Sequence, residues 1–269
     1  MSDCKTIDEK IKDKFSPYFK TLPTNNIKHI IAVCSGKGGV GKSFTTAMLA
    51  VSMMKRGYKV GILDADITGP SVPHAFGIHD KITGTKDSKL IPAESKNGIK
   101  IVSINLLLEH EEDAVVWRGP VLANALQQFY SDTMWGDIDY LFVDMPPGTS
   151  DVALTVFKNF PISGVIIVST PQELVHMIVG KAVQMAEMLK LNVIGIIENF
   201  AYIKCPHCGE AIYYNGDSTL YDLCNTYHTF PLGSIPFDPE QRNILDKGMV
   251  EEANTEEFDD AVESILEIK

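Results

Sequence analysis

Residues 34–43 read CSGKGGVGKS, and this stretch decides the fold. From Gly36 onward it matches the spacing G-x-x-x-x-G-K-[ST] of a phosphate-binding loop, with Lys42 and Ser43 in the last two positions. The apolar stretch HIIAVCS runs into the loop, and the helical pattern KSFTTAMLAVSMMKRG leaves it. Glycine lets successive N–H groups point at phosphate oxygens, and the helix aims its positive end at the same anion. The stretch therefore predicts a nucleotide site between a strand and a helix.

The loop contains two lysines with different expected roles. We expect Lys42 to reach the β- and γ-phosphates and Ser43 to ligate Mg²⁺. Lys37 follows the first glycine, and from there it cannot easily double the contact of Lys42. It is therefore either a solvated side chain or a cation that extends toward nucleotide on a facing subunit. In the second case it would stabilise developing charge as an arginine finger does.

Apolar segments alternate with helical patterns on both sides of the loop. The expected strands are 29–35, 59–66, 98–104, 138–148, 163–171, 192–200 and a short one at 231–236. Strands that are apolar throughout and separated by helices predict an α/β fold, with a mostly parallel sheet covered by helices on both faces. We expect residues 1–26 to be a lead-in, with Ile7, Ile11 and Phe15 on one helical face, and 27–269 to form a single ATPase domain.

Composition excludes several classes of function. The 269 residues have a net charge of −11, which argues against nucleic-acid binding through a basic face. No run of about 18 apolar residues is present, so we expect no membrane span. The first ten residues, MSDCKTIDEK, lack the apolar core of a signal peptide, and we expect the protein in the cytoplasm.

Three aspartates follow apolar strands. Asp64 and Asp66 end one strand, at the edge where such folds bind ligands, so one carboxylate can hold Mg²⁺ and the other can orient the attacking water. LFVDMPPGTSD places Asp144 at the end of another strand, which is the pattern of a Walker B aspartate on the metal. Gly148 can offer its N–H to a γ-phosphate. Asp151 either adds polar contacts or caps a helix.

These motifs together resemble a known class. KGGVGKS is similar to the deviant phosphate loop of the SIMIBI class of P-loop NTPases, which includes MinD and ParA proteins, the nitrogenase iron protein and iron–sulfur carrier ATPases. DxDxxGPS and DxPPGTxD resemble the Mrp/ApbC branch of that class, and the resemblance runs from about Lys28 to Lys247. It implies a homodimer in which Lys37 crosses to the partner's nucleotide.

The resemblance also implies individual roles. Asp66 would take the hydrolytic role, Asp64 the metal side, and Asn199 would contact adenine. Phe200 departs from the family's usual methionine, without consequence for Asn199. The expected nucleotide-binding residues are Gly36, Lys37, Gly38, Gly39, Val40, Gly41, Lys42, Ser43, Phe44 and Asn199. The expected catalytic residues are Lys37, Lys42 and Asp66, and the expected Mg²⁺ ligands are Ser43, Asp64 and Asp144.

Cys205 and Cys208 form a CxxC motif, CPHCG, just after the strand at 192–200. Two thiolates are half of a tetrahedral set, and two copies of the chain can complete it at a symmetry axis. Sulfur donors suit a [4Fe–4S] cluster or Zn²⁺, and a redox dithiol is a third alternative. The position after ENF in a deviant-loop ATPase resembles the bridging-cluster motif of Mrp/ApbC carriers, which favours the cluster. We expect Cys34 to be a buried strand residue and Cys224 an ordinary helix position, and Cys4 is isolated.

The sequence thus predicts a homodimeric ATPase that uses ATP and Mg²⁺, holds a bridging [4Fe–4S] cluster and transfers it to apo iron–sulfur proteins. Scaffold or donor proteins would supply the cluster, and neither nucleic acid nor membrane is an expected partner. The main alternative is a MinD/ParA-like positioning or partition ATPase with a structural zinc knuckle. A second alternative is a kinase of small metabolites.

Overall fold

The computed structural model describes residues 19–66, 69, 71–85, 87–107, 119–148, 150–171, 173–214, 216 and 218–268. The helix expected around Ile7, Ile11 and Phe15 lies outside these residues, as does Cys4. The division into a lead-in at 1–26 and a domain at 27–269 therefore stays a prediction.

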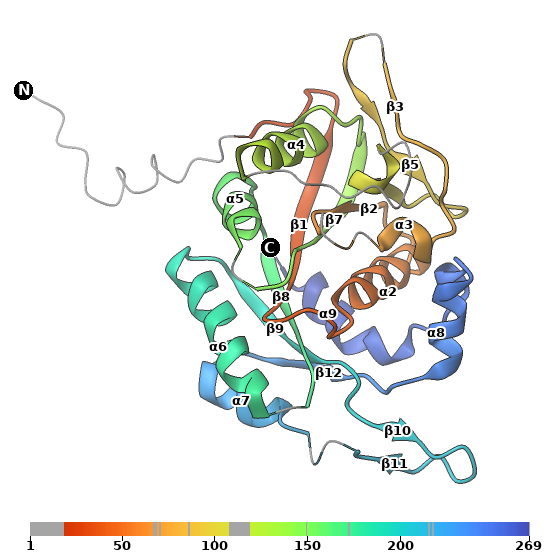
Figure 1. Cartoon of the computed structure of the whole chain (residues 1–269), viewed down its shortest axis with the longest axis vertical. Coiled ribbons are helices and arrows are strands. Elements are labelled where there is room, and N and C mark those ends of the chain that lie inside the picture. Colours follow the sequence, from red (N-terminus) through yellow and green to blue (C-terminus); the bar gives the residue numbers. More distant parts are fainter. Residues whose placement is uncertain are drawn as a thin grey trace, which may run out of the picture.

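The centre of the described part is an eight-stranded sheet (Figure 1). Across the sheet the strands are β12 (Pro231–Ser234), β9 (Val193–Glu198), β8 (Gly164–Ser169), β1 (Asn26–Ser35), β7 (Asp137–Asp144), β2 (Val60–Asp64), β6 (Lys100–Ser103) and β5 (Ala93–Glu94). All neighbours pair in parallel except β5, which is antiparallel to β6. The expected mostly parallel sheet is confirmed.

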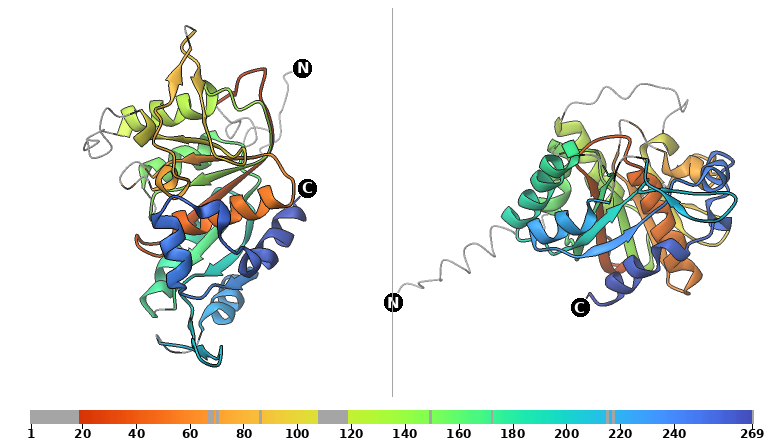
Figure 2. Two further views of the ribbon diagram at one scale, coloured as in Figure 1. Left: turned by 90° about the vertical axis from the view of Figure 1, so that its right-hand side faces the viewer. Right: turned by 90° about the horizontal axis from the view of Figure 1, so that it is seen from below.

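Helices cover both faces, and β1 shows why, because its buried side chains alternate between two cores. Ile30, Ala32 and Cys34 belong to one core, and Ile31 and Val33 to the other. The first core is covered by α4 (Gly119–Ser131), α5 (Asp151–Asn159), α6 (Glu173–Met188) and α7 (Leu220–Tyr227). The second is covered by α2 (Lys42–Lys55), α3 (Val72–Ala75), α8 (Pro239–Asp246) and α9 (Asp259–Leu266), on the opposite side of the sheet (Figure 2).

Short elements complete the described chain. Three 3₁₀ turns span Ile104–Leu106, Val250–Glu252 and Glu256–Phe258. Two antiparallel hairpins, which the sequence pattern did not predict, pair β3 (Thr83–Gly84) with β4 (Leu90–Ile91), and β10 (Ile203–Lys204) with β11 (Ala211–Ile212). Among the described residues, none of the helices combines the length and apolar character that a membrane crossing requires.

The ends of three parallel strands, β1, β7 and β2, meet at one edge of the sheet. Asp64 pairs in register with Asp144, and Asp144 with Val33, three residues before the first glycine of the phosphate loop. Ligands in open α/β sheets bind outside this carboxyl edge. One local expectation is corrected there: Asp151 is the first residue of α5, and Ser150 is the N-cap, with its hydroxyl accepting from the N–H of Ala153.

Candidate functional site

The phosphate loop joins β1 to α2 as the sequence pattern predicts. Gly41 is the N-cap of α2 in the left-handed conformation, with φ of 78°. A Cβ atom built there would lie 2.1 Å from Nδ2 of Asn199, so only glycine fits both the backbone and the space. The start of α2 thereby presents backbone N–H groups and the positive end of a helix to an anion.

A buried polar network lies beneath the loop. Lys42 Nζ is 2.8 Å from Oδ1 of Asp144, and their side chains are 6% and 0% exposed. Ser43 Oγ donates to Oδ2 of Asp144 at 2.5 Å, and Thr46 Oγ1 donates to Oδ1 at 2.9 Å. Burial by itself would lower the pKa of Lys42, but the charge and hydrogen bond of Asp144, together with the charges of Asp66 and Asp64, outweigh it, and the pKa lies above its usual value. Lys42 is therefore a permanent cation between the loop and the end of β7.

Asp64 and Asp66 adjoin this network. Asp66 Oδ2 lies 3.5 Å from Lys42 Nζ. Asp64 is fully buried, where it accepts from Ser103 Oγ at 3.0 Å and from the N–H of Asp66 at 3.1 Å. Burial, together with the nearby charge of Asp144, raises the pKa of Asp64 well above its usual range. A cation beside such a buried carboxylate stabilises its charged form, and this environment suits the expected place of Mg²⁺.

Asn199 lies against the loop rather than in an open pocket. Its side chain is fully buried, and Nδ2 donates to the carbonyl oxygen of Val40 at 2.9 Å. Its Oδ1 is buried and lacks a hydrogen-bond partner among the described residues. The side chain thus holds the phosphate loop in this structure, and its expected contact with adenine stays a prediction.

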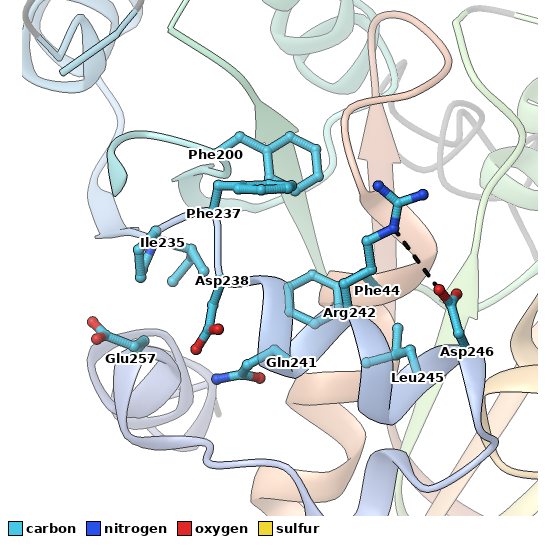
Figure 3. A pocket seen from close by; sticks show the side chains of 11 residues that line it. Phe44, Phe200, Ile235, Phe237, Asp238, Gln241, Arg242, Leu245, Asp246 and Glu257 are labelled. Atoms are coloured by element: carbon cyan, nitrogen blue, oxygen red, sulfur yellow. Dashed lines mark ion pairs between the residues drawn. The ribbon is translucent and has the colours of Figure 1, made fainter. Parts of the chain in front are cut away.

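Phe44 and Phe200 open onto a cavity of about 200 Å³ beside the loop (Figure 3). Phe200 follows Asn199, and its ring packs edge-on against Phe237 at 5.8 Å. Ile235 and Leu245 add apolar walls, and the polar side chains that line the cavity are Asp238, Gln241, Arg242, Asp246 and Glu257. Sequence reasoning missed the wall at 235–246. Its signal was IPFDP directly after the short strand PLGS, a stiff turn from a strand to the N-cap of α8.

Lys37 and Gly148 both contact Ser35, the residue just before the first glycine of the phosphate loop. Lys37 is half-buried, and its carbonyl oxygen accepts from Ser35 Oγ at 3.0 Å. Gly148 donates its N–H to the carbonyl oxygen of Ser35 at 2.8 Å and has φ of 76°. In this conformation the Gly148 N–H is already used within the protein, so its role toward a γ-phosphate needs a movement of the 145–148 segment.

Cys205 and Cys208 lie at the turn of the β10–β11 hairpin. The turn is closed by the N–H of Gly209 on the carbonyl oxygen of Cys205, and by the N–H of Cys205 on that of Glu210, each at 2.8 Å. Cys208 is exposed and Cys205 is partly exposed. Backbone N–H groups of Cys208 and His207 face the sulfur of Cys205 and lower its pKa. A thiolate is the form that binds metal, so the donor set fits a sulfur-ligated metal group.

The other described cysteines do not join this pair. Cys34 is buried on β1 and Cys224 is buried on α7, as expected. Burial raises the pKa of the Cys34 thiol to about 12 and that of Cys224 to about 11. In the described part of the chain, no three His, Cys, Asp or Glu side chains gather closely enough to hold a metal ion. The described chain thus offers two thiolates, not four.

A glycine-rich loop between a parallel strand and a helix, with its lysine paired to the aspartate at the end of another strand, defines a P-loop NTPase. The chain belongs to the ParA family of NUBPL iron-transfer P-loop NTPases, whose family model matches residues 26–268. The resemblance drawn from the motifs is confirmed.

Curated relatives agree with this membership. An iron–sulfur cluster carrier protein of Clostridium perfringens is 47% identical over 241 residues, covering 86% of this chain and 84% of the relative. Relatives with the same name from Aquifex aeolicus and Methanocaldococcus jannaschii are 45% and 40% identical. They cover 86% and 97% of this chain, and 64% and 88% of their own lengths.

Solved structures support the fold. A nucleotide-binding protein of Archaeoglobus fulgidus, in complex with ADP, is 41% identical with a TM-score of 0.78, covering 95% of this chain and 97% of that one. MinD in the MinC–MinD complex of Aquifex aeolicus is 19% identical with a TM-score of 0.64, covering 88% and 95%. The second likeness shows the shared fold alone.

Proposed function

We propose that the chain is an ATPase that carries an iron–sulfur cluster and delivers it to apo-proteins. The observation that carries this proposal is the pair Cys205 and Cys208, accessible at a hairpin turn whose N–H groups favour thiolate, in the same chain as a complete phosphate loop. The names of the relatives support it, since proteins 38–47% identical to this chain are called iron–sulfur cluster carriers.

The nucleotide side follows from the buried network. ATP would place its phosphates on residues 36–43, with Lys42 on the β- and γ-phosphates. Ser43, Asp64 and Asp144 would hold Mg²⁺, which supplies charge neutralisation between phosphate oxygens. Asp66, close to Lys42, would orient the attacking water. The apolar cavity between Phe44 and Phe200 would receive the base, with Asn199 beside it.

The cargo side needs a second copy of the chain. Two thiolates from each subunit would make the four that a [4Fe–4S] cluster takes. The same pairing would bring Lys37 of each subunit to the nucleotide of the other. Apo iron–sulfur proteins would receive the cluster, and scaffold or donor proteins would supply it.

A positioning ATPase of the MinD/ParA kind with a zinc knuckle shares the fold but is not better supported, because those likenesses are 19% or less identical. The two readings differ in what the thiol pair holds. Anaerobic reconstitution with iron and sulfide tests this directly. We expect about four irons per dimer and the absorbance of a cluster. About one zinc ion per dimer and no iron would contradict the carrier function.

The variant Cys205→Ala should abolish cluster binding and bind ADP as the metal-free wild-type protein does, because the thiol lies on the hairpin and not in the phosphate loop. Cys224→Ala is the matched control, since it removes a buried thiol from α7 and should keep the full cluster. A Cys205→Ala protein that still took up four irons would show that the cluster is held elsewhere.

A further inference from the structure

The β10–β11 hairpin projects from the body of the protein at the β12 side of the sheet (Figure 1). It carries Cys205 and Cys208 at its turn, and the other end of the hairpin contacts the cavity beside the phosphate loop. Three contacts within one chain join the hairpin to this cavity. Each joins a residue on the hairpin or directly beside it to a residue that lines the cavity.

The first contact joins Tyr214 to Phe200. Tyr214 Oη donates to the carbonyl oxygen of Phe200 at 3.0 Å. Phe200 has φ of 56°, a left-handed conformation that side chains other than glycine rarely adopt. Its ring reaches the loop, since a Cβ atom built on Gly41 would lie 3.1 Å from Cζ of Phe200. Tyr214 therefore helps to hold a strained residue that touches both the cavity and the phosphate loop.

The other two contacts reach further residues that line the cavity. The N–H of Phe237 donates to the carbonyl oxygen of Tyr202 at 2.8 Å. Lys204, the residue before Cys205, forms an ion pair with Glu257. Phe237 and Glu257 both line the cavity (Figure 3). The hairpin and its flanks thus contact three residues that line the cavity, namely Phe200 and Phe237, whose rings pack together, and Glu257.

We propose that Tyr214 and the Lys204–Glu257 pair are positioning residues that couple the thiol pair to the nucleotide cavity of the same subunit. A metal group on Cys205 and Cys208 orders the hairpin, and the ordered hairpin fixes Phe200 and Phe237 in the arrangement that a base enters. When the metal group has already ordered these residues, nucleotide binding no longer bears the entropic cost of ordering them. The two ligands therefore bind with positive cooperativity. The coupling is reciprocal, and nucleotide tightens the hold on the metal group. This inference rests on the proposed function for both ligands.

The test measures ADP affinity calorimetrically on the metal-free protein and on the protein loaded with Zn²⁺ as the probe metal. We expect the loaded protein to bind ADP about fivefold more tightly, at the lower end of usual coupling between sites. Tyr214→Phe removes only the hydroxyl, and it should bring the ratio to within about twofold of one. Adding Glu257→Gln to that variant should bring the ratio to one.

Tyr213→Phe is the matched control. Tyr213 and Tyr214 are neighbours on the hairpin, 47% and 48% exposed, and Tyr213 packs its ring against Tyr202. Tyr213→Phe should keep the fivefold ratio. A general loss of folding would lower the melting temperature and the affinity in both metal states alike. The ratio between the two states responds only to the coupling.

The outcomes separate the inference from the proposed function. A ratio of one or below in the wild-type protein, with ADP and Zn²⁺ both bound, overturns the coupling and leaves the proposed function standing. Equal ratios in Tyr214→Phe and Tyr213→Phe also overturn it. Two outcomes overturn both the inference and the proposed function. In one the wild-type protein binds no ADP, and in the other the variant Cys205→Ser/Cys208→Ser binds Zn²⁺ as the wild-type protein does.

Discussion

At Gly41 an added methyl group would collide with a side chain beside the phosphate loop. Its φ of 78° lies in the left-handed region, and a Cβ atom would lie 2.1 Å from the side chain of Asn199. Gly57, just after the last residues of α2, has φ of 90° but no heavy atom within 4 Å of a built Cβ. Substitution by alanine would therefore strain the backbone at both glycines, but it would cause a steric clash only at Gly41.

Gly41→Ala should lower the free energy of unfolding by about 1–2 kcal/mol for the backbone, plus a further loss from the displaced Asn199. Gly57→Ala should show the first part alone and keep ADP binding, whereas Gly41→Ala should lose it. Urea denaturation and ADP titration measure both effects. Equal unfolding losses with ADP binding intact in Gly41→Ala would show that the loop does not need the close contact.

At the scale of elements, Asp139 holds the amino ends of three strands together. Its Oδ1 lies 2.7 Å from Lys28 Nζ on β1, and its Oδ2 accepts from the N–H of Lys59, just before β2, at 2.8 Å. The hydrogen bond from Lys28 is the main reason that the pKa of Asp139 lies below its usual value. A depressed folded-state pKa stabilises the protein above the unfolded pKa, and this stability is lost as the pH falls through the folded value.

Asp139→Asn should therefore destabilise the protein at pH 7 by up to about 1 kcal/mol, because the ion pair is partly exposed. The difference from wild type should begin to shrink as the pH falls below about 4, where the carboxyl of the unfolded chain is protonated, and it should be lost below the depressed pKa of Asp139 in the folded protein. Urea denaturation between pH 3 and pH 7 measures it. Asp137→Asn, which removes the charge from an exposed ion pair with Lys59 at 3.6 Å, should have a smaller effect. A gap that stays constant with pH would contradict the assigned ion pair.

The elements that could be predicted from sequence are those with a long apolar signal. The stretch IIAVC of β1 and LFV of β7 are buried on both faces, so they read as central parallel strands. Strands of two residues, such as β10 and β11, have no period to detect, and the antiparallel β5 is equally short. The CxxC motif was visible in the sequence, but the hairpin that presents it was not.

The residues of the site also divide into those that the sequence predicts and those that only the tertiary structure brings together. Lys42, Ser43 and Asp144 belong to motifs with fixed spacing, and the structure brings them together. The cavity depends on segments that are far apart in the chain, with Phe44 on one wall and Phe237 on another, so it needed the tertiary structure. Asn199 was identified by its motif, whereas its burial under the loop follows from close packing with Gly41.

At the scale of the whole molecule, two features remain incomplete within one subunit. The described residues gather two thiolates, whereas a [4Fe–4S] cluster takes four, and Lys37 lies on the early part of a loop in which Lys42 is the expected phosphate ligand. The proposed twofold axis through facing subunits would resolve both, because each subunit would then supply what the other lacks. Such a pairing would make the hydrolysis of ATP depend on residues from both chains.

Mixing two inactive variants tests this dependence. In Lys37→Ala the subunit keeps Asp66, and in Asp66→Asn it keeps Lys37, so a mixed dimer has one site with its own Asp66 and the partner's Lys37. Random exchange of equal amounts makes half of the dimers mixed, and the mixture should recover about one quarter of the wild-type rate. Lys37→Ala mixed with the double variant Lys37→Ala/Asp66→Asn is the control and should stay inactive. If Lys37 instead served its own subunit, neither mixture would gain activity, because no single chain would contain both residues.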